Sequence, residues 1–398
     1  MANPLDQLFV LLKQWLVALL PVGLQPLLSM VLSAAALIAV FASLFAVTTL
    51  LERKGLGRLQ NRLGPNRTGP FGILQPLADG LKMLTKEDIV PEAADQVVHF
   101  LAPLVMVVPV LTAYAVLPMG RNMVAVDFDG GVLFFFAVGA STELSVFMAG
   151  WASRNKYSLL GAMRAIAQMI SYEVPLVLAS VTVVMTVGSL SLVRIVQSQS
   201  GYHWGWLARW HVFTPWGLAG LLLFLIAAAA ECNRTPFDIP EGESEIIAGH
   251  LVEYSGFKYA LFFLGEYLGM FAVSSLGISL FLGGWEAPVS FLTWIPSYVW
   301  FFGKLLGFIS LFIWLRGTLP RLRTDQLMNF AWKFLLPMTL VNLVAAAGWH
   351  FSAGWSFPGA LAWRWLFSAA VVGVPYLALG HALAGRVHLG PRSYRYAT

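Results

Sequence analysis

The sequence predicts an all-α protein, a polytopic transmembrane helix bundle of about nine spans. Of its 398 residues, 58% are hydrophobic and only 11% are charged, whereas soluble domains carry about 25% charged residues. The apolar residues form long runs without the alternation typical of outer-membrane strands, so helices rather than a barrel are expected to satisfy the backbone in lipid. The single cysteine, Cys232, excludes a disulfide framework and an iron–sulfur cluster held by this chain alone.

Nine apolar segments approach the ~20 residues that a helix needs to cross a bilayer. They lie at residues 27–51, 97–119, 131–152, 166–188, 213–231, 257–283, 296–316, 327–348 and 361–383. The first 23 residues lack the basic start of a secretory signal, and Lys13 interrupts their apolar part. We therefore expect a short interfacial helix before the first span.

The basic residues indicate how the chain is oriented. Most of the 25 Lys and Arg residues fall in the segments after the first, third, fifth and seventh spans and in the C-terminal tail. Cytoplasmic loops carry an excess of such residues, so the sequence predicts the N-terminus outside and the C-terminus in the cytoplasm. Most tryptophans lie at the span ends that this orientation places outside, as in an aromatic belt.

The loop expected between the first two spans, residues 52–96, contains a predicted amphipathic helix. Five apolar residues recur at helical spacing: Ile73, Leu74, Leu77, Leu81 and Leu84. Asp79, Lys82 and Lys86 lie on the other face. This pattern favours a helix among the lipid headgroups, and it is compatible with a helix that lines the entrance of a cavity.

The segment 231–256, between the fifth and sixth spans, concentrates acidic residues. It contains one cation, Arg234, within a run of six carboxylates: Glu231, Asp238, Glu241, Glu243, Glu245 and Glu253. Pro236 and Pro240 favour a defined turn around Phe237. The acids after Pro240 suit the first turns of a helix, where the helix dipole favours anions. A charge cluster placed directly between two spans favours a functional role over a solvated loop.

Four acids lie within or at the end of predicted spans: Glu143, Glu173, Glu231 and Glu266. Three of them lie about 8–10 residues from a cytoplasmic end, or ~12–15 Å deep at a rise of about 1.5 Å per residue. Pairing with buried cations would explain them structurally, but few cations are available: Lys304 lies well inside a span, and Arg164 sits at a span end. A line of buried carboxyl groups suits a proton relay, so we predict a relay from the cytoplasmic loops to mid-membrane.

The histidines indicate no cofactor site. His99 and His381 lie near span positions, and two isolated imidazoles do not form the facing pair that a haem in a bundle requires. We predict no metal and no cofactor bound by this chain. His250, within the acidic segment, either assists proton movement near neutral pH or is a plain interfacial histidine. The net charge of +5 does not indicate a nucleic-acid partner, because in a membrane protein the placement of basic residues matters more than their sum.

Three groups of motifs resemble one protein family. The acidic segment contains Glu-Cys-Asn-Arg-Thr-Pro-Phe-Asp-Ile-Pro-Glu-Gly-Glu-Ser-Glu and ends in Glu-Tyr-Ser-Gly. A second motif runs from residue 52 through residues 60–67 and 74–82 to residue 88, and a third covers residues 143–157 and 164–175. Together they resemble the quinone-site membrane subunit, called the H subunit, of the bacterial proton-pumping NADH:quinone oxidoreductase, respiratory complex I. The resemblance covers residues 25–350.

This resemblance implies a membrane subunit that joins the two arms of the complex, forms part of the chamber through which quinone enters, and couples quinone reduction to proton pumping. It implies a carboxylate relay of Glu143, Glu173, Glu231, Glu241, Glu243, Glu245 and Glu266. It also implies residues along the quinone passage: Glu52, Arg53, Asp79, Lys82, Phe237 and Asp238. FMN and iron–sulfur clusters are then expected on partner subunits, and the chain is expected in the inner membrane of a bacterium.

The sequence departs from the family pattern at its C-terminus. Residues 1–350 form the family-like domain, whereas residues 351–398 add a ninth apolar stretch and a basic tail. We expect this extra stretch to be a helix that faces lipid or a lateral neighbour.

Two other functions stay open at this point. The equivalent subunit of a membrane-bound hydrogenase or a ferredoxin-dependent complex would look similar, because the electron input lies on other subunits. A stand-alone ion transporter would need a route to the outer face, and transporters often contain an internal repeat. The acids stop at mid-membrane and no repeat is visible in the sequence.

Overall fold

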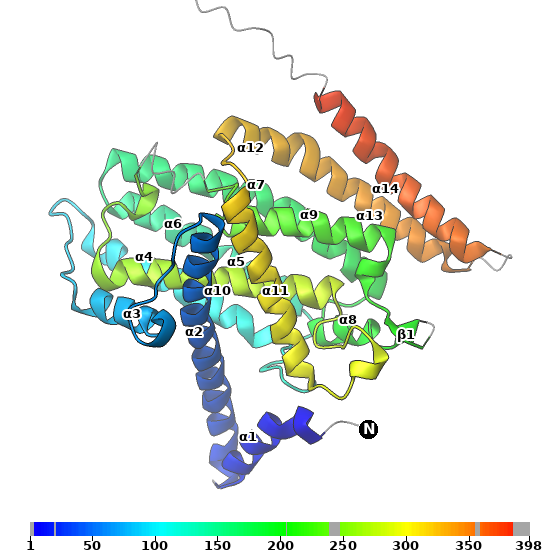
Figure 1. The fold of residues 1–398 in the computed structure, drawn as a ribbon, viewed down its shortest axis with the longest axis horizontal. Coiled ribbons are helices and arrows are strands. Elements are labelled where there is room, and N and C mark those ends of the chain that lie inside the picture. Colours follow the sequence, from blue (N-terminus) through cyan, green and yellow to red (C-terminus); the bar gives the residue numbers. More distant parts are fainter. Residues whose placement is uncertain (1–3, 20, 204, 239–246, 355–358, 385–398) are drawn as a thin grey trace, which may run out of the picture.

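The computed structural model describes residues 4–19, 21–203, 205–238, 247–354 and 359–384. Helices dominate these residues, as the sequence predicts (Figure 1). The α-helices are α1 (Leu8–Ala18), α2 (Gln25–Leu59), α3 (Gln75–Thr85), α4 (Gln96–Ala113), α5 (Gly131–Gly139), α6 (Ser141–Ala152), α7 (Lys156–Val187), α8 (Leu192–Ser198), α9 (Pro215–Glu231), α10 (Gly256–Phe281), α11 (Ser297–Thr318), α12 (Thr324–Phe330), α13 (Leu336–Phe351) and α14 (Ala360–Ala384).

Short elements connect these helices. Single 3₁₀ turns lie at η1 (Pro4–Gln7), η2 (Val22–Leu24), η3 (Pro70–Gly72), η4 (Tyr114–Val116), η5 (His211–Phe213), η6 (Gly249–Leu251), η7 (Ser290–Leu292) and η9 (Ser352–Gly354). A π-helical turn, η8 (Ala331–Leu335), joins α12 to α13. The strands β1 (Tyr202–His203) and β2 (Leu207–Ala208) pair antiparallel in a small hairpin.

Eight helical stretches of the described residues are long and apolar enough to cross a membrane. They are Val22–Leu59, Gln96–Val116, Gly131–Ala152, Lys156–Val187, Gly256–Phe281, Ser297–Thr318, Thr324–Gly354 and Ala360–Ala382. The fifth predicted span, residues 213–231, is the helix α9, which has 17 residues and is shorter than the others. By length and apolar character, eight of the nine predicted spans are therefore long enough to cross a membrane.

The first span is longer than expected. Helix α2 continues to Leu59, past the predicted end at residue 51, so Glu52 lies within it. Residues 51–59 lack proline, and the Leu, Glu, Arg and Lys residues that favour a helix outnumber the two glycines, Gly55 and Gly57. In Figure 1 the N-terminal half of α2 stands away from the bundle, with α1 folded beside it. The cytoplasmic helix predicted in residues 73–84 is present as α3.

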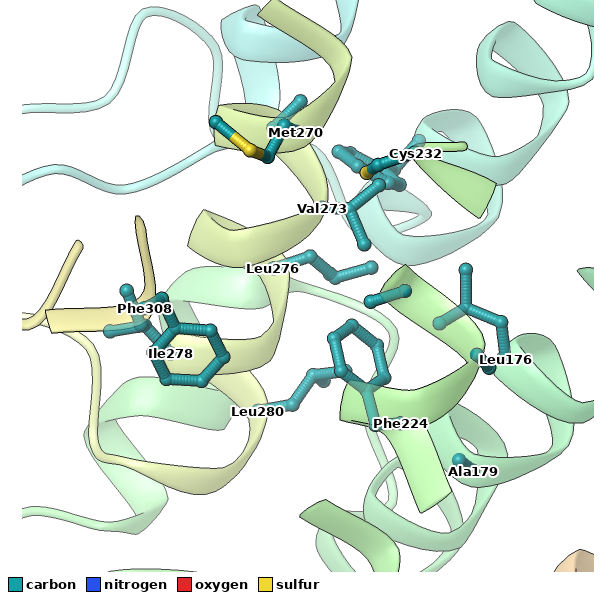
Figure 2. Packing of buried hydrophobic residues seen from close by; sticks show 14 of the residues in the cluster. Leu176, Ala179, Phe224, Cys232, Met270, Val273, Leu276, Ile278, Leu280 and Phe308 are labelled. Atoms are coloured by element: carbon teal, nitrogen blue, oxygen red, sulfur yellow. The ribbon is translucent and has the colours of Figure 1, made fainter. Parts of the chain in front are cut away.

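Helix α10 lies in the centre of the core. Its apolar window is 72% buried, the highest share among the eight spans. Small residues allow the neighbours to approach: a Cβ atom on Gly265 would lie 2.5 Å from Met106 of α4, and one on Gly277 would lie 2.6 Å from the ring of Phe224 on α9. Figure 2 shows Phe224 beside Leu276 and Leu280 of α10 in this core.

The additional C-terminal stretch forms the helix α14, which packs along α13 and α9. Arg364, near the start of α14, donates hydrogen bonds to the carbonyl oxygen of Trp349 at 3.0 Å and to Ser352 Oγ at 3.1 Å. Its guanidinium also lies 4.4 Å from the centre of the Trp349 ring. This arginine therefore fastens α14 to the end of α13, while most large apolar side chains of α14 are exposed.

Candidate functional site

A buried charge cluster joins four elements at the base of the acidic segment. It consists of Glu52 on α2, Arg234 after the end of α9, Glu266 and Tyr267 on α10, and Arg316 on α11. The side chains of Glu52 and Arg234 are 6% and 7% exposed. Charges this deeply buried are expected to be paired.

Glu52 accepts hydrogen bonds from three sides. Arg234 Nη1 lies 3.2 Å from Glu52 Oε1, and Tyr267 Oη donates to Glu52 Oε2 at 2.5 Å. Arg316 pairs with the same carboxylate. Arg234 also lies with its guanidinium carbon 4.2 Å from the centre of the Tyr267 ring and its Nε 3.6 Å from Glu266 Oε1. Glu52 and Glu266 thus share one buried arginine.

The environment of this arginine keeps it charged. Burial alone lowers the pKa of Arg234, but the negative charges of Glu266 and Glu52 and the side chain of Tyr267 outweigh burial, so the pKa is raised above its usual value. Nearby Asp238 behaves differently. Burial raises the pKa of Asp238, and the arginines around it, with Arg321 as its 2.9 Å ion-pair partner, oppose this shift only in part.

A small opening adjoins the cluster. It has a cavity volume of about 20 Å³, room for about one water molecule, and is lined by Asn233, Arg234, Thr235, Asp238, Phe263, Glu266 and Arg316. Sites for drug-sized ligands usually measure about 300–1,000 Å³. Among the described residues, Arg234 Nη2 is buried here without a hydrogen-bond partner. The opening therefore presents charged and donor groups, but it is small for an organic ligand of that size.

Three further acids form a second cluster on α6, α7 and α9. The side chains of Glu143 and Glu173 are hydrogen bonded to each other, and both lie within electrostatic range of Glu231. Two carboxyl groups can share a hydrogen bond only if one of them carries a proton. Among the described residues, Glu143 Oε1 and Glu231 Oε2 are buried without a hydrogen-bond partner. The fold thus brings three of the predicted relay acids together, and two of their carboxyl oxygens could accept a hydrogen bond from water.

The C-terminal end of α9 connects the two clusters. Glu231 ends α9 in the second cluster, and Arg234 belongs to the first. Gln168 of α7 fixes the intervening turn by donating to the carbonyl oxygens of Ala230 at 2.8 Å and Phe237 at 2.6 Å. The predicted acids are therefore arranged in two groups joined by residues 231–234.

The structure places the predicted quinone-passage residues in different surroundings. Glu52 belongs to the charge cluster, and Asp238 lines the opening beside it. Arg53 pairs with Asp79 at 2.5 Å between α2 and α3, and Lys82 is exposed on α3. Phe237 is buried, with its ring 5.2 Å from that of Tyr172 on α7.

Glu241, Glu243 and Glu245 lie outside the described residues. The expectation that few cations reach the intramembrane acids is wrong for Glu266, which lies beside Arg234. Sequence reasoning does not assign Tyr267 or Arg316 to the site. Arg316 has one signal, its place in a cluster of basic residues at a predicted cytoplasmic span end.

Lys304, a candidate counter-ion for the acids from its place in the sequence, has other partners. It donates to the carbonyl oxygens of Leu282, Gly284 and Glu286 at 2.7–2.8 Å. Its ammonium also lies 4.1 Å from the centre of the Trp210 ring. Within the described part of the chain, no group of three or more His, Cys, Asp or Glu side chains is arranged to hold a metal ion.

Comparison with known proteins identifies the family. A family model described as NADH dehydrogenase matches residues 32–347. The chain is 51% identical over 297 residues to the H subunit of the NADH-quinone oxidoreductase of Dehalococcoides mccartyi (strain CBDB1), and the match covers 75% of this chain and 80% of that protein. This chain belongs to the H-subunit family of NADH-quinone oxidoreductase.

Two other relatives bearing the same name support this assignment. Identity is 49% over 321 residues with the protein of Geobacillus kaustophilus (strain HTA426), covering 80% of this chain and 93% of the relative. It is 43% over 341 residues with that of Polaromonas naphthalenivorans (strain CJ2), covering 83% and 93%. The family match includes both carboxylate clusters, whereas α14 lies beyond residue 347.

Proposed function

We propose that this chain is a membrane subunit of a proton-translocating NADH:quinone oxidoreductase, in which it forms part of the quinone chamber and carries a carboxylate relay. Family membership over residues 32–347 carries this proposal, and the names of the relatives supply the reaction of the whole complex. FMN and iron–sulfur clusters would reside on partner subunits, and NADH would be oxidised there.

The charge cluster suits the quinone side of this function. Arg234 Nη2 is buried beside the small opening and, among the described residues, has no hydrogen-bond partner, so it can donate to a carbonyl oxygen. An opening of about 20 Å³ is far too small for a quinone. We infer that peripheral quinone-site subunits complete the chamber, with Arg53, Asp79, Lys82 and Phe237 close to its access route.

The second cluster suits proton movement. Reduction of a quinone takes up protons together with electrons, so it changes the charge near the opening. Glu266 and Glu52 would sense that change through Arg234, and the turn at residues 231–234 would pass it to Glu231, Glu173 and Glu143. Glu241, Glu243 and Glu245 are proposed to continue this relay on the cytoplasmic side. Intramembrane carboxylates that share protons are the usual elements of such relays.

The proposed placement in the membrane follows the basic residues. The N-terminus would lie outside and the C-terminus in the cytoplasm of a bacterium, which requires α9 to cross the inner membrane as well. A 17-residue helix reaches ~26 Å at about 1.5 Å per residue, near the lower limit for a span.

Substitution of the shared carboxyls tests the relay. Glu143→Gln and Glu173→Gln remove the ionisable groups with little change of shape, so we expect at least about tenfold less pumping-linked quinone reductase activity, a barrier change of about 1.4 kcal/mol, in complexes that still assemble. Asp129→Asn is the matched control, because Asp129 is 82% exposed beside Arg194. Full activity and undiminished pumping in both Gln variants would reject the relay.

A further inference from the structure

The last four residues of the acidic segment contact several different parts of the fold. They are Glu253, Tyr254, Ser255 and Gly256, the Glu-Tyr-Ser-Gly motif that ends the segment. The relay and the quinone opening do not use them. Ser255 and Gly256 contact the stretch after α3, Glu253 contacts the start of α7, and Tyr254 contacts α4, so the quartet is a junction of the fold.

Ser255 and Gly256 hold the segment that follows α3. Ser255 Oγ accepts a hydrogen bond from Ile89 N at 2.8 Å and lies 3.3 Å from the carbonyl oxygen of Glu87 as a donor. Gly256 has a φ of +56°, and a Cβ atom there would lie 3.2 Å from the Lys86 carbonyl oxygen. Both the left-handed backbone and the close approach favour glycine at this position.

One ion pair reinforces this contact. Lys258, in the first turn of α10, pairs with Asp88 at 2.8 Å. Near its middle α3 is also tied to α2, since Asp79 pairs with Arg53 at 2.5 Å. Helix α3 is therefore held between α2 and the start of α10.

Glu253 holds the junction of α6 and α7. Asn155 Nδ2 donates to Glu253 Oε1 at 2.7 Å, and Asn155 Oδ1 caps α7 by accepting from Tyr157 N at 2.9 Å. The backbones also meet here, since a Cβ atom on Gly161 would lie 2.5 Å from Gly249 Cα. Helices α6 and α7 carry Glu143 and Glu173, so this contact fixes the cytoplasmic ends of the helices that bear the carboxyl pair.

Tyr254 reaches the remaining element, α4. Its ring stacks on that of His99 with centroids 4.0 Å apart and an angle of 4° between the planes. It also meets the ring of Phe262 on α10, with centroids 4.9 Å apart. Both Tyr254 and His99 are buried, so the quartet is anchored in the core as well as at the surface.

We propose that residues 253–256 are a positioning hub that sets α3 relative to the α6–α7 junction. Ser255 controls the α3 side, Glu253 controls the carboxylate side, and Tyr254 fixes both to the core. The functional meaning rests on the proposed function, in which α3 borders the quinone access route and α6 and α7 carry relay acids. In the hub, Glu253 acts as a hydrogen-bond acceptor and its charge is not required.

Hydrogen exchange in the intact purified complex tests the hub without assuming any function. Ser255→Ala removes the contacts to residues 87 and 89, and Glu253→Ala removes the contact to Asn155. We expect each variant to speed amide exchange on both sides, at residues 86–90 and 154–158, by about tenfold, the effect of one lost buried hydrogen bond. The control Ser180→Ala removes a buried hydroxyl that bonds only within α7, to Leu176 O. Changes confined to the side of each substitution would overturn the hub.

A conservative variant separates positioning from proton transfer. The carbonyl oxygen of glutamine can accept the same bond from Asn155, so Glu253→Gln should keep wild-type exchange, and kcat and KM for quinone within about twofold. Glu253→Ala should lose activity. Lost activity in Glu253→Gln with unchanged exchange would mean that the charge matters and would refute positioning. If Ser255→Ala and Glu253→Ala each speed exchange at both residues 86–90 and 154–158, while Glu143→Gln and Glu173→Gln remain fully active, the hub stands and the relay fails.

Discussion

Replacing the buried Arg234 by methionine should destabilise the chain more than replacing an exposed arginine by methionine does. The side chain is 7% exposed, and it contacts Glu52 at 3.2 Å, Glu266 at 3.6 Å and the Tyr267 ring at 4.2 Å. Methionine has a similar length and no charge. The substitution therefore leaves two buried carboxylates with less positive charge around them, while the volume of the site changes little.

The contacts give the size of the effect. A hydrogen bond between charged groups contributes about 1.5–3 kcal/mol, and a desolvated cation over an aromatic ring contributes about 0.5–2 kcal/mol. Glu52 keeps Arg316 and Tyr267 as partners, so we expect a total of about 3–5 kcal/mol, the range for breaking a buried pair. For a chain of 398 residues that corresponds to a loss of about 4–6 °C in thermal stability.

The assay is the temperature at which half of the detergent-solubilised complex loses this subunit. Arg194→Met is the matched control, because Arg194 is 63% exposed, its partner Asp129 is 82% exposed, and such exposed pairs contribute about 0–1 kcal/mol. Arg234→Lys should fall between the two, since it keeps the charge and loses the planar fork. An Arg234→Met variant no less stable than Arg194→Met would refute this account of the cluster.

Two further predictions concern other buried groups. Burial lowers the pKa of His250 from 6.5 to about 4, so the neutral ring contributes stability that is complete above about pH 6.5 and is lost as the pH falls toward 4. His250→Phe should remove this decrease of thermal stability between pH 6.5 and 4. A variant that keeps the same decrease would contradict the prediction. Lys304→Met leaves the carbonyl oxygens of Leu282, Gly284 and Glu286 without their donor, so the same thermal assay should register a loss of about 2–4 kcal/mol, and a variant as stable as the parent would exclude this role.

The positions of the helices and of most acids could be predicted from the sequence. Long apolar runs are sufficient to place most spans, and the location of Glu143 on α6 and Glu173 on α7 follows from where those runs lie. The ends of α2 and α7 are harder to predict, because polar residues continue these helices beyond the apolar runs. Hydropathy predicts a full span at the short α9, because hydropathy alone does not fix where a helix begins.

The pairing of the charges could not be predicted. Glu52 and Arg234 are separated by 182 positions, and Glu52 and Arg316 by 264. Such contacts depend on how helices pack, which local patterns do not encode. The sequence therefore indicates a single line of acids, whereas packing divides them into a charge-paired group around Arg234 and a second group of carboxyls, Glu143, Glu173 and Glu231.

The turn that ends α9 carries a member of each group, Glu231 and Arg234. Arg234 N bonds to Ala229 O at 3.0 Å and Phe237 N bonds to Arg234 O at 2.8 Å, so backbone hydrogen bonds tie this turn to the last turn of α9. At an effective dielectric constant of about 20, stretching a 3.6 Å ion pair by about 1 Å costs about 1 kcal/mol. A small rotation of this turn that moved Glu231 would therefore also weaken or strengthen the attraction between Arg234 and Glu266 by an energy of this size.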